Sequence, residues 1–173
     1  METTQNQFVF PNWVRVVLVG RRPKYTALRV TALVVISLAI FPFVLRPVKI
    51  TGDSMAPTYR DGSVNFVNRL AYVFAEPKRG DVVGIRMAGE SVMFMKRIIG
   101  LPGETVQFLD GVVHINGEPL HEPYLKLPCN WTTHTVTLGP EGYYFMGDNR
   151  SMPRQDHSGG ERERSRIVGK VIL

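Results

Sequence analysis

Residues 91–117 read SVMFMKRIIGLPGETVQFLDGVVHING, and this stretch decides the fold. Asp110-Gly111 separates two short runs of apolar and β-branched residues, which is a strong signal for a hairpin with a two-residue turn. Asn116-Gly117 follows as a second turn of the same kind. Short strands joined by tight turns, with no helix between them, predict antiparallel pairing.

The same pattern extends to both sides of this stretch. Strands are predicted at residues 64–68, 81–86, 91–99, 105–109, 112–115, 135–138, 143–146 and 167–172. Because no helical crossovers separate them, the expected fold class is mainly β, with antiparallel β-sheets in a sandwich or open barrel.

An apolar segment precedes these strands. Residues 27–45 read ALRVTALVVISLAIFPFVL, and 19 residues of helix span about 28 Å, close to the hydrocarbon thickness of a bilayer. The run is long for the apolar part of a secretory signal and has no small-x-small cleavage site after it, which favours a retained anchor over a cleaved signal.

The charges around this segment predict its orientation. Five basic residues precede it or lie near its start: Arg15, Arg21, Arg22, Lys24 and Arg29. Such an excess places the N-terminus in the cytoplasm. The expected organisation is a cytoplasmic tail at 1–26, a transmembrane anchor at 27–45 and an extracytoplasmic domain at 46–173, in the cytoplasmic membrane.

Composition excludes several other classes of protein. The 173 residues carry a net charge of +6, but no basic stripe with interleaved aromatic residues points to nucleic acid. Cys129 is the single cysteine, and the four histidines lack metal-ligand spacing, so no metal is expected and each histidine is interpreted as a surface residue. Arg162, Arg164 and Arg166 alternate with acidic residues and are interpreted as a mixed solvated segment.

Ser54 and Lys96 are the candidates for chemistry. A serine hydroxyl needs a base, and a lysine can be that base where desolvation lowers its pKa. Alternation along a strand places Phe94, Lys96 and Ile98 on one apolar face and Arg97 on the other. The plainer alternatives are a half-exposed strand lysine whose amine reaches water and a serine in an ordinary turn.

Five segments occur in a characteristic order behind the anchor. They are GDSMAPT at 52–58, RGDVV at 79–83, KRIIGLPGE at 96–104, GYYFMGDNR at 142–150 and IVGK at 167–170. Together they resemble the bacterial type I signal peptidases (leader peptidases), the serine–lysine peptidases of family S26 that remove signal peptides from exported proteins.

The resemblance implies a role for each matching residue. Ser54 would be the nucleophile that forms an acyl-enzyme, Lys96 the general base, and Met55 part of the substrate pocket. The Ser54 backbone N–H would stabilise the oxyanion, and Gly52 stands where many members carry a second serine as a further donor. The remaining matches, implied to be structural near the site, are Asp148, Asn149 and Arg150.

The resemblance also implies the partners. They are exported preproteins with small residues before the cleavage site, and the lipid bilayer. No cofactor is needed, because a serine–lysine dyad works without one.

One departure from the family pattern stands after Arg150. Counted without gaps, Pro153 occupies the place of the serine that orients the catalytic lysine, and either Ser151 or Ser158 could substitute for it. The alternatives to a general signal peptidase are therefore a specialised member serving one secretion or conjugation substrate, or a catalytically impaired paralogue that binds signal peptides. Because the dyad is intact, activity is expected.

Overall fold

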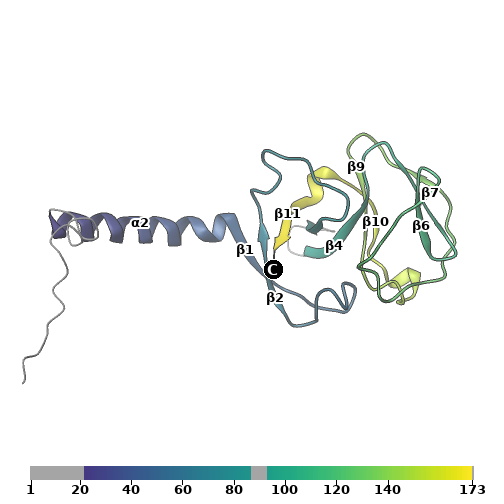
Figure 1. The fold of residues 1–173 in the computed structure, drawn as a ribbon, viewed down its shortest axis with the longest axis horizontal. Helices are drawn as coiled ribbons and strands as arrows, with labels where there is room; N and C mark the ends of the chain where they lie inside the picture. The colour runs from purple at the N-terminus through teal and green to yellow at the C-terminus, as the bar shows by residue number, and fades with distance from the viewer. Residues whose placement is uncertain (1–21, 87–92, 173) are drawn as a thin grey trace, which may run out of the picture. The chain divides into compact units, whose positions relative to one another are not determined.

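The computed structural model describes residues 22–86 and 93–172, which divide into an N-terminal unit up to Pro42 and a β domain from Phe43 onward (Figure 1). The described part of the N-terminal unit consists mostly of helix α2 (Pro23–Val44), whose last two residues already belong to the β domain. Its residues Lys24–Val44 are long and apolar enough to cross a membrane. The helix begins four residues before the predicted anchor, because proline is favoured in a first helical turn. Most of the expected tail, residues 1–21, lies outside the described residues.

The β domain contains a seven-stranded sheet in which every neighbouring pair is antiparallel. The strand order is β1-β2-β11-β3-β4-β9-β10. The strands are β1 (Leu45–Lys49), β2 (Val64–Asn68), β3 (Val82–Arg86), β4 (Met93–Gly100), β9 (Gly142–Met146), β10 (Gly160–Glu163) and β11 (Ile167–Ile172). The 3₁₀ turns η1 (Arg154–Asp156) and η2 (Arg164–Arg166) flank β10.

A second, four-stranded sheet has the order β7-β6-β5-β8. Its strands are β5 (Thr105–Leu109), β6 (Val112–Ile115), β7 (Glu118–Pro119) and β8 (Val136–Thr137). Both predicted turns are present: φ is positive at Asp110 (47°), Gly111 (83°), Asn116 (51°) and Gly117 (85°). Positive φ at both central residues is what a two-residue hairpin of the primed type requires, so the prediction of antiparallel β structure is confirmed.

The structure differs from the prediction at three strands. Leu45, expected to end the anchor, begins β1, and the short strand β7 was not predicted. The segment interpreted as mixed and solvated forms β10, where Glu161 and Glu163 are exposed. The exposure of these residues agrees with that interpretation, but the strand itself was not predicted; charged residues are common on edge strands, which natural sheets protect in this way. Ser91 and Val92 of the predicted 91–99 strand lie outside the described residues.

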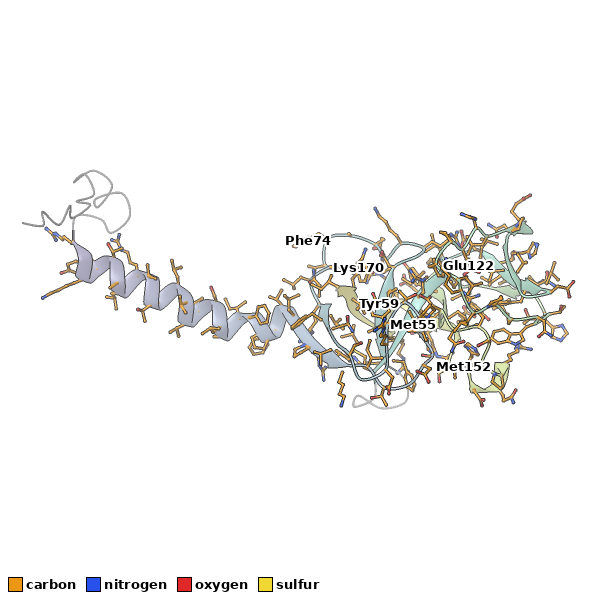
Figure 2. All side chains as sticks on the ribbon, turned by 60° about the horizontal axis from the view of Figure 1, so that its bottom comes forward. Met55, Tyr59, Phe74, Glu122, Met152 and Lys170 are labelled. Atoms are coloured by element: carbon orange, nitrogen blue, oxygen red, sulfur yellow. The ribbon has the colours of Figure 1, made fainter. Side chains whose placement is uncertain are left out.

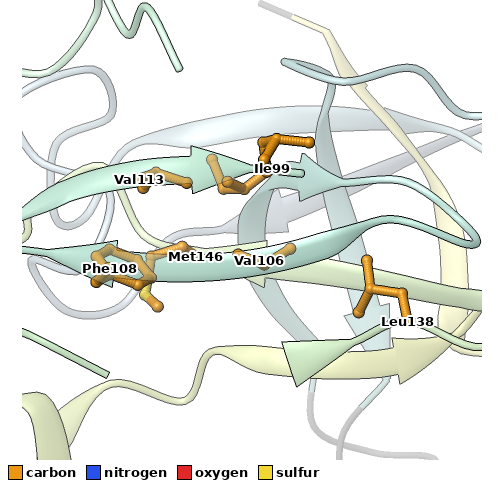
Figure 3. Packing of buried hydrophobic residues seen from close by; sticks show 7 residues of the cluster. Ile99, Val106, Phe108, Val113, Leu138 and Met146 are labelled. Carbon is orange, nitrogen blue, oxygen red and sulfur yellow. The ribbon is translucent and has the colours of Figure 1, made fainter. Parts of the chain in front are cut away.

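The core connects the two sheets through β4 and β9. Ile99 at the end of β4 and Met146 at the end of β9 pack with residues of the second sheet, among them Val106, Phe108 and Val113 (Figure 3). Closer to the middle of the first sheet, a separate cluster covers one face of β4. Its members are Val83, Ile85, Ile98, Tyr143 and Phe145. The strands β4 and β9 are therefore buried on both faces, and they carry the residues of the site.

Candidate active site

Lys96 lies in the middle of β4, opposite Val83 of β3, and is only 1% exposed. Burial lowers the pKa of its ammonium group from 10.5 to about 8, although the Asp148 carboxylate acts in the opposite direction. The alternative of a half-exposed lysine is therefore wrong. Desolvation disfavours the charged form, so a substantial fraction of Lys96 is neutral near pH 8.

The Ser54 loop packs against Gly147, the residue that follows β9. Met146, at the end of β9, pairs with Arg97 of β4, the residue after Lys96. A Cβ at Gly147 would collide with the Ser54 carbonyl oxygen and lie 3.4 Å from Ser54 Cβ. The Ser54 backbone therefore fills the space that a side chain at Gly147 would need, next to the pair of strands that carries Lys96.

Three hydrogen bonds hold the 53–58 loop against the turn formed by residues 147–149. The Asn149 backbone N–H donates to the Ser54 carbonyl (3.0 Å), and Asn149 Nδ2 donates to the Asp53 carbonyl (3.1 Å). Thr58 Oγ1 donates to Asp148 Oδ2 (2.6 Å). The 147–149 turn thus fixes the backbone on both sides of the Ser54 side chain.

A buried ion pair between Arg97 and Asp148 stabilises the 147–149 turn. Arg97 Nε and Nη2 donate to the two oxygens of Asp148 at 2.8 and 2.6 Å, and Asp148 is fully buried. Arg97 Nη1 donates to the Gly80 carbonyl (2.7 Å), and its guanidinium lies 3.8 Å from the centroid of the Tyr124 ring. Arg97 was not among the predicted site residues. The signal that could have found it is its position on a strand covered on both faces, where a cation requires a partner.

Arg150 supports the turn from the other side. It is fully buried, and its Nε donates to the Gly147 carbonyl (2.7 Å). Its Nη2 donates to Glu122 Oε1 (2.7 Å), which joins the turn to the loop that carries Glu122. The residues 148, 149 and 150 therefore position the backbone of the Ser54 loop, and each does so through a different contact.

A cleft of about 430 Å³ opens beside Ser54. Most of its lining is apolar, and Ser54 and Met55 both contribute to it. The other lining residues are Val48, Lys49, Ile50, Thr51, Val67, Gly84, Met93, Phe94, Met95 and Val171. Met55 is 1% exposed and packs in one cluster with Tyr59 (Figure 2). Lys96 does not line the cleft, so substrate atoms would meet Ser54 first.

Gly52 lies at the edge of this loop. Its φ of 94° is in the left-handed region that favours glycine. Its backbone N–H donates to Asp61 Oδ1 at 2.8 Å. In this structure that N–H is therefore bonded within the loop.

The two candidate lysine-orienting serines have different surroundings. Ser151 is exposed, and its Oγ donates to Asn149 Oδ1 (2.7 Å) within its own turn. Ser158 is half-buried, and its hydroxyl makes no hydrogen bond to another described residue. The segment before β10 follows β9 toward Gly147, since Gly160 pairs with Phe145 and a Cβ at Gly159 would lie 2.9 Å from Met146 Sδ. Ser158 therefore lies beside the end of β9, on the edge of that strand that β10 occupies.

His157 was missed at the sequence level and is not a surface residue. Both ring nitrogens are buried without a hydrogen-bond partner among the described residues, and the ring lies edge-on to Trp131 with centroids 4.6 Å apart. Burial, together with the positive charges of Lys96 and Arg150, lowers the pKa of His157 to about 4. The imidazole of His157 is therefore neutral at pH 7, and the Lys96 charge is one cause. No pattern around residue 157 distinguishes it from the other histidines.

Within residues 22–86 and 93–172, no three His, Cys, Asp or Glu side chains come together as a metal site. The arrangement offers a serine hydroxyl on the lining of an apolar cleft and a desolvated amine on β4. A buried polar turn fixes the backbone of the loop that carries the serine.

The chain is similar to known proteins of one family. The family profile described as "Signal peptidase, peptidase S26" matches residues 24–173. A signal peptidase I of Bacillus amyloliquefaciens is 39% identical over 147 residues, covering 79% of this chain and 76% of that protein. Signal peptidase I T of Bacillus subtilis is 38% identical over the same length and with the same shares. A signal peptidase I of Leptolyngbya laminosa is 34% identical over 148 residues, 81% of this chain and 73% of that protein.

A solved structure was also found. The crystal structure of a signal peptidase I from Enterococcus faecalis is 30% identical to this chain, with a TM-score of 0.46, and the match covers 57% of this chain and 98% of that one.

Proposed function

The chain belongs to the signal peptidase family, peptidase S26, and from this membership we propose that Ser54 is its nucleophile and Lys96 its general base. It is a serine endopeptidase of the signal peptidase I kind, and its substrates are exported preproteins. One observation carries the assignment of the dyad. The Ser54 loop packs on Gly147 at the end of β9, and β9 pairs with β4, which carries a lysine that is 1% exposed and has a pKa lowered to about 8.

The proposed reaction has two steps. Neutral Lys96 accepts the hydroxyl proton of Ser54 as Ser54 Oγ attacks the scissile carbonyl carbon. The C–N bond breaks, the amine of the mature protein leaves with the proton from Lys96, and an ester to Ser54 remains. Lys96 then takes a proton from water as the water oxygen attacks the ester carbonyl carbon. The bond from that carbon to Ser54 Oγ breaks, Lys96 returns the proton to Ser54 Oγ, and the signal peptide leaves with the new carboxylate.

The developing oxyanion requires a donor in the nucleophile loop. The Ser54 backbone N–H is the proposed donor, since backbone donors fixed in advance are effective at such positions. The Gly52 N–H is bonded to Asp61 and would contribute only after that hydrogen bond is broken.

Ser158 is the better candidate for orienting Lys96. Ser151 is exposed and donates its hydroxyl to Asn149, whereas Ser158 is half-buried and lies beside the end of β9. We expect Ser158→Ala to lower kcat at least tenfold and Ser151→Ala to change it less than twofold.

The cleft supports the substrate preference. Met55 and its neighbours leave an apolar space beside Ser54, and such a space suits an extended signal peptide with small residues before the cut. Helix α2 is the proposed single-span anchor. Arg22, Lys24 and Arg29 near its start favour a cytoplasmic N-terminus, which places the β domain on the extracytoplasmic face.

The test is cleavage of a preprotein with an Ala-x-Ala site by the detergent-solubilised chain. Ser54→Ala and Lys96→Ala should each abolish cleavage, while Lys126→Ala, at an exposed lysine, should leave it unchanged. The cleavage rate of the parent should rise with pH as a single group, Lys96, loses its proton near pH 8. A Lys96→Ala variant that cleaves at the parental rate would refute the dyad.

Pro153, at the place of the usual orienting serine, favours a specialised family member as the second candidate. Complementation of cells depleted of their housekeeping signal peptidase separates the two, because a specialist should not restore growth. Hydrolysis by the pure protein would exclude a paralogue that only binds signal peptides.

A further inference from the structure

The apolar cleft has a glycine in its wall. Gly84, in the middle of β3, lines the cleft together with Met93 and Val67. A Cβ built at Gly84 would lie 2.7 Å from Met93 Sδ and 3.5 Å from Val67 Cγ2. The space over Gly84 is therefore occupied by the end of the Met93 side chain, and Val67 lies beside it.

The pairing of β3 with β4 explains how Met93 reaches this space. Gly84 pairs with Met95, and Met93 stands two residues before Met95 in the same strand. Residues two apart on a strand face the same side of the sheet, so both methionines face the cleft. Gly84 does not have the positive φ of Gly52, so its backbone conformation is open to other residues. A side chain at position 84 would meet Met93 rather than backbone strain.

Met93 is the movable part of this arrangement. It is half-buried and packs against the cluster that contains Met55, Val67 and Val171. Methionine is unbranched and has three rotatable bonds, so its end moves at little cost. Met55, at 1% exposure, has no such freedom. When the Met93 thioether turns toward solvent, it leaves an apolar space between Gly84 and Val67.

The size of that space sets what can enter it. Methionine and leucine have similar volumes, so the place of the Met93 side chain suits a leucine side chain. A substrate bound in an extended conformation presents alternate side chains to the same side. The first and third residues before the cut, positions −1 and −3, therefore face the cleft together.

From these observations we propose that Met93 is a movable filler over Gly84, and that its displacement lets the cleft accept a leucine-sized side chain at position −1 or −3. This inference rests on the proposed function, because it concerns the preprotein substrate of the same cleft. Gly84 and Met93 are then residues that determine specificity. Binding surfaces that contain methionine re-pack around different ligands in this way.

The first experiment compares three preproteins in detergent. One carries the Ala-x-Ala site, and the other two carry leucine in place of the alanine at −1 or at −3. The measured quantity is the ratio of kcat/KM for a leucine substrate to kcat/KM for the alanine substrate. For the parent, this ratio should lie within about tenfold of one at one of the two positions. A parent that cleaves the alanine substrate and neither leucine substrate would overturn the proposal.

Two variants should shift this ratio in opposite directions. The methyl group added by Gly84→Ala takes part of the space for leucine and should lower the ratio about tenfold. Met93→Ala removes the filler and should raise the ratio at the same position. The matched control is Met152→Ala, at a half-buried methionine outside the cleft lining. Ratios in Gly84→Ala and Met93→Ala equal to that of the parent would overturn the proposal.

The second experiment does not depend on cleavage. The Ser54→Ala variant, labelled with ¹³C at its methionine methyl groups, is titrated in detergent with the alanine and leucine signal peptides and followed by NMR. The Met93 resonance, assigned by its loss in Met93→Ala, should shift more with the leucine peptide than with the alanine peptide. The Met152 resonance should not respond. Equal shifts of Met93 with both peptides would overturn the proposal.

These readouts separate the inference from the proposed function. Cleavage of the alanine substrate that requires Ser54 supports the proposed function, whatever the ratios for leucine are. If the parent cleaves none of the three preproteins, the peptidase activity fails, and the NMR comparison then decides whether Met93 yields to a larger side chain.

Discussion

Lys96 is buried in an apolar environment, and that environment has a cost for stability when its amine is charged. Its pKa falls from 10.5 to about 8 on folding. At about 1.4 kcal/mol per pH unit, that shift corresponds to roughly 3 kcal/mol lost from the folded state when the lysine is charged. The unfolded chain binds one more proton than the folded chain between pH 8 and 10.5, so stability rises with pH across that window.

We therefore predict that Lys96→Met abolishes cleavage and raises the free energy of unfolding by up to about 3 kcal/mol at pH 7. The gain should shrink as the pH rises toward 10.5, because the parental lysine is then neutral in both states. Denaturant unfolding at pH 7 and pH 10 measures it. A variant less stable than the parent at both pH values would show that burial does not penalise the charge.

His157 is the second residue whose titration is coupled to folding. Its pKa is lowered to about 4, so between pH 6.5 and 4 the unfolded chain binds a proton that the folded chain does not. Stability contributed by the neutral ring is present above pH 6.5 and is lost as the pH falls through this window.

We predict that His157→Gln loses less thermal stability than the parent between pH 6.5 and 4, because glutamine does not titrate. The melting temperature across this range is the measurement, taken as a difference so that the carboxylates common to both proteins cancel. His134→Gln, at an exposed histidine, is the control and should follow the parent. Parallel curves for His157→Gln and the parent would contradict the lowered pKa.

The 147–149 turn is the element that positions the Ser54 backbone. It joins three kinds of contact: close backbone packing at Gly147, an ion pair at Asp148 and two hydrogen bonds from Asn149. None of these residues performs chemistry. Their common effect is to fix the Ser54 backbone beside β4, and a displacement of about 1 Å at such a position can cost about 100-fold in rate.

We predict that Gly147→Ala lowers kcat by about 100-fold, because the added methyl group collides with the Ser54 carbonyl and moves the loop away from Lys96. The KM should change little, since the cleft lining is unaltered. Gly139→Ala is the matched control, because its nearest neighbour to an added Cβ is Glu161 Oε1 at 3.9 Å. Equal kcat values for the two variants would exclude the packing role of Gly147.

In the β domain, strand β11 comes late in the chain but occupies a central place in the sheet, and this determines when the sheet can form. β11 lies between β2 and β3, pairs with both, and contributes Val171 to the core beside Met55. The sheet therefore cannot close until the C-terminal residues have been synthesised. The pairing between β2 and β11 joins residues about 100 positions apart, and such long-range contacts slow folding.

We predict that a chain ending at Arg166 does not form the β domain, because both β2 and β3 would lose a neighbouring strand. Limited proteolysis and circular dichroism in detergent would show it. Ile172→Ser, at a residue 36% exposed, should fold and serves as the control. A protease-resistant domain in the truncated chain would contradict this account of the sheet.

The sequence by itself determined the mainly β class, the two hairpin turns and the apolar span, and it singled out Ser54 and Lys96 as the proposed dyad. These features depend on local patterns: alternation along strands, the need for positive φ at Asp110-Gly111 and Asn116-Gly117, and the length of an apolar run. The tertiary structure decided which residues surround Ser54 and Lys96. His157 has no local signal, and Arg97 has only its position on a buried strand, because the partners of both come from strands and loops distant in the chain. The strand order is likewise a product of long-range packing, which short-range periodicity does not contain.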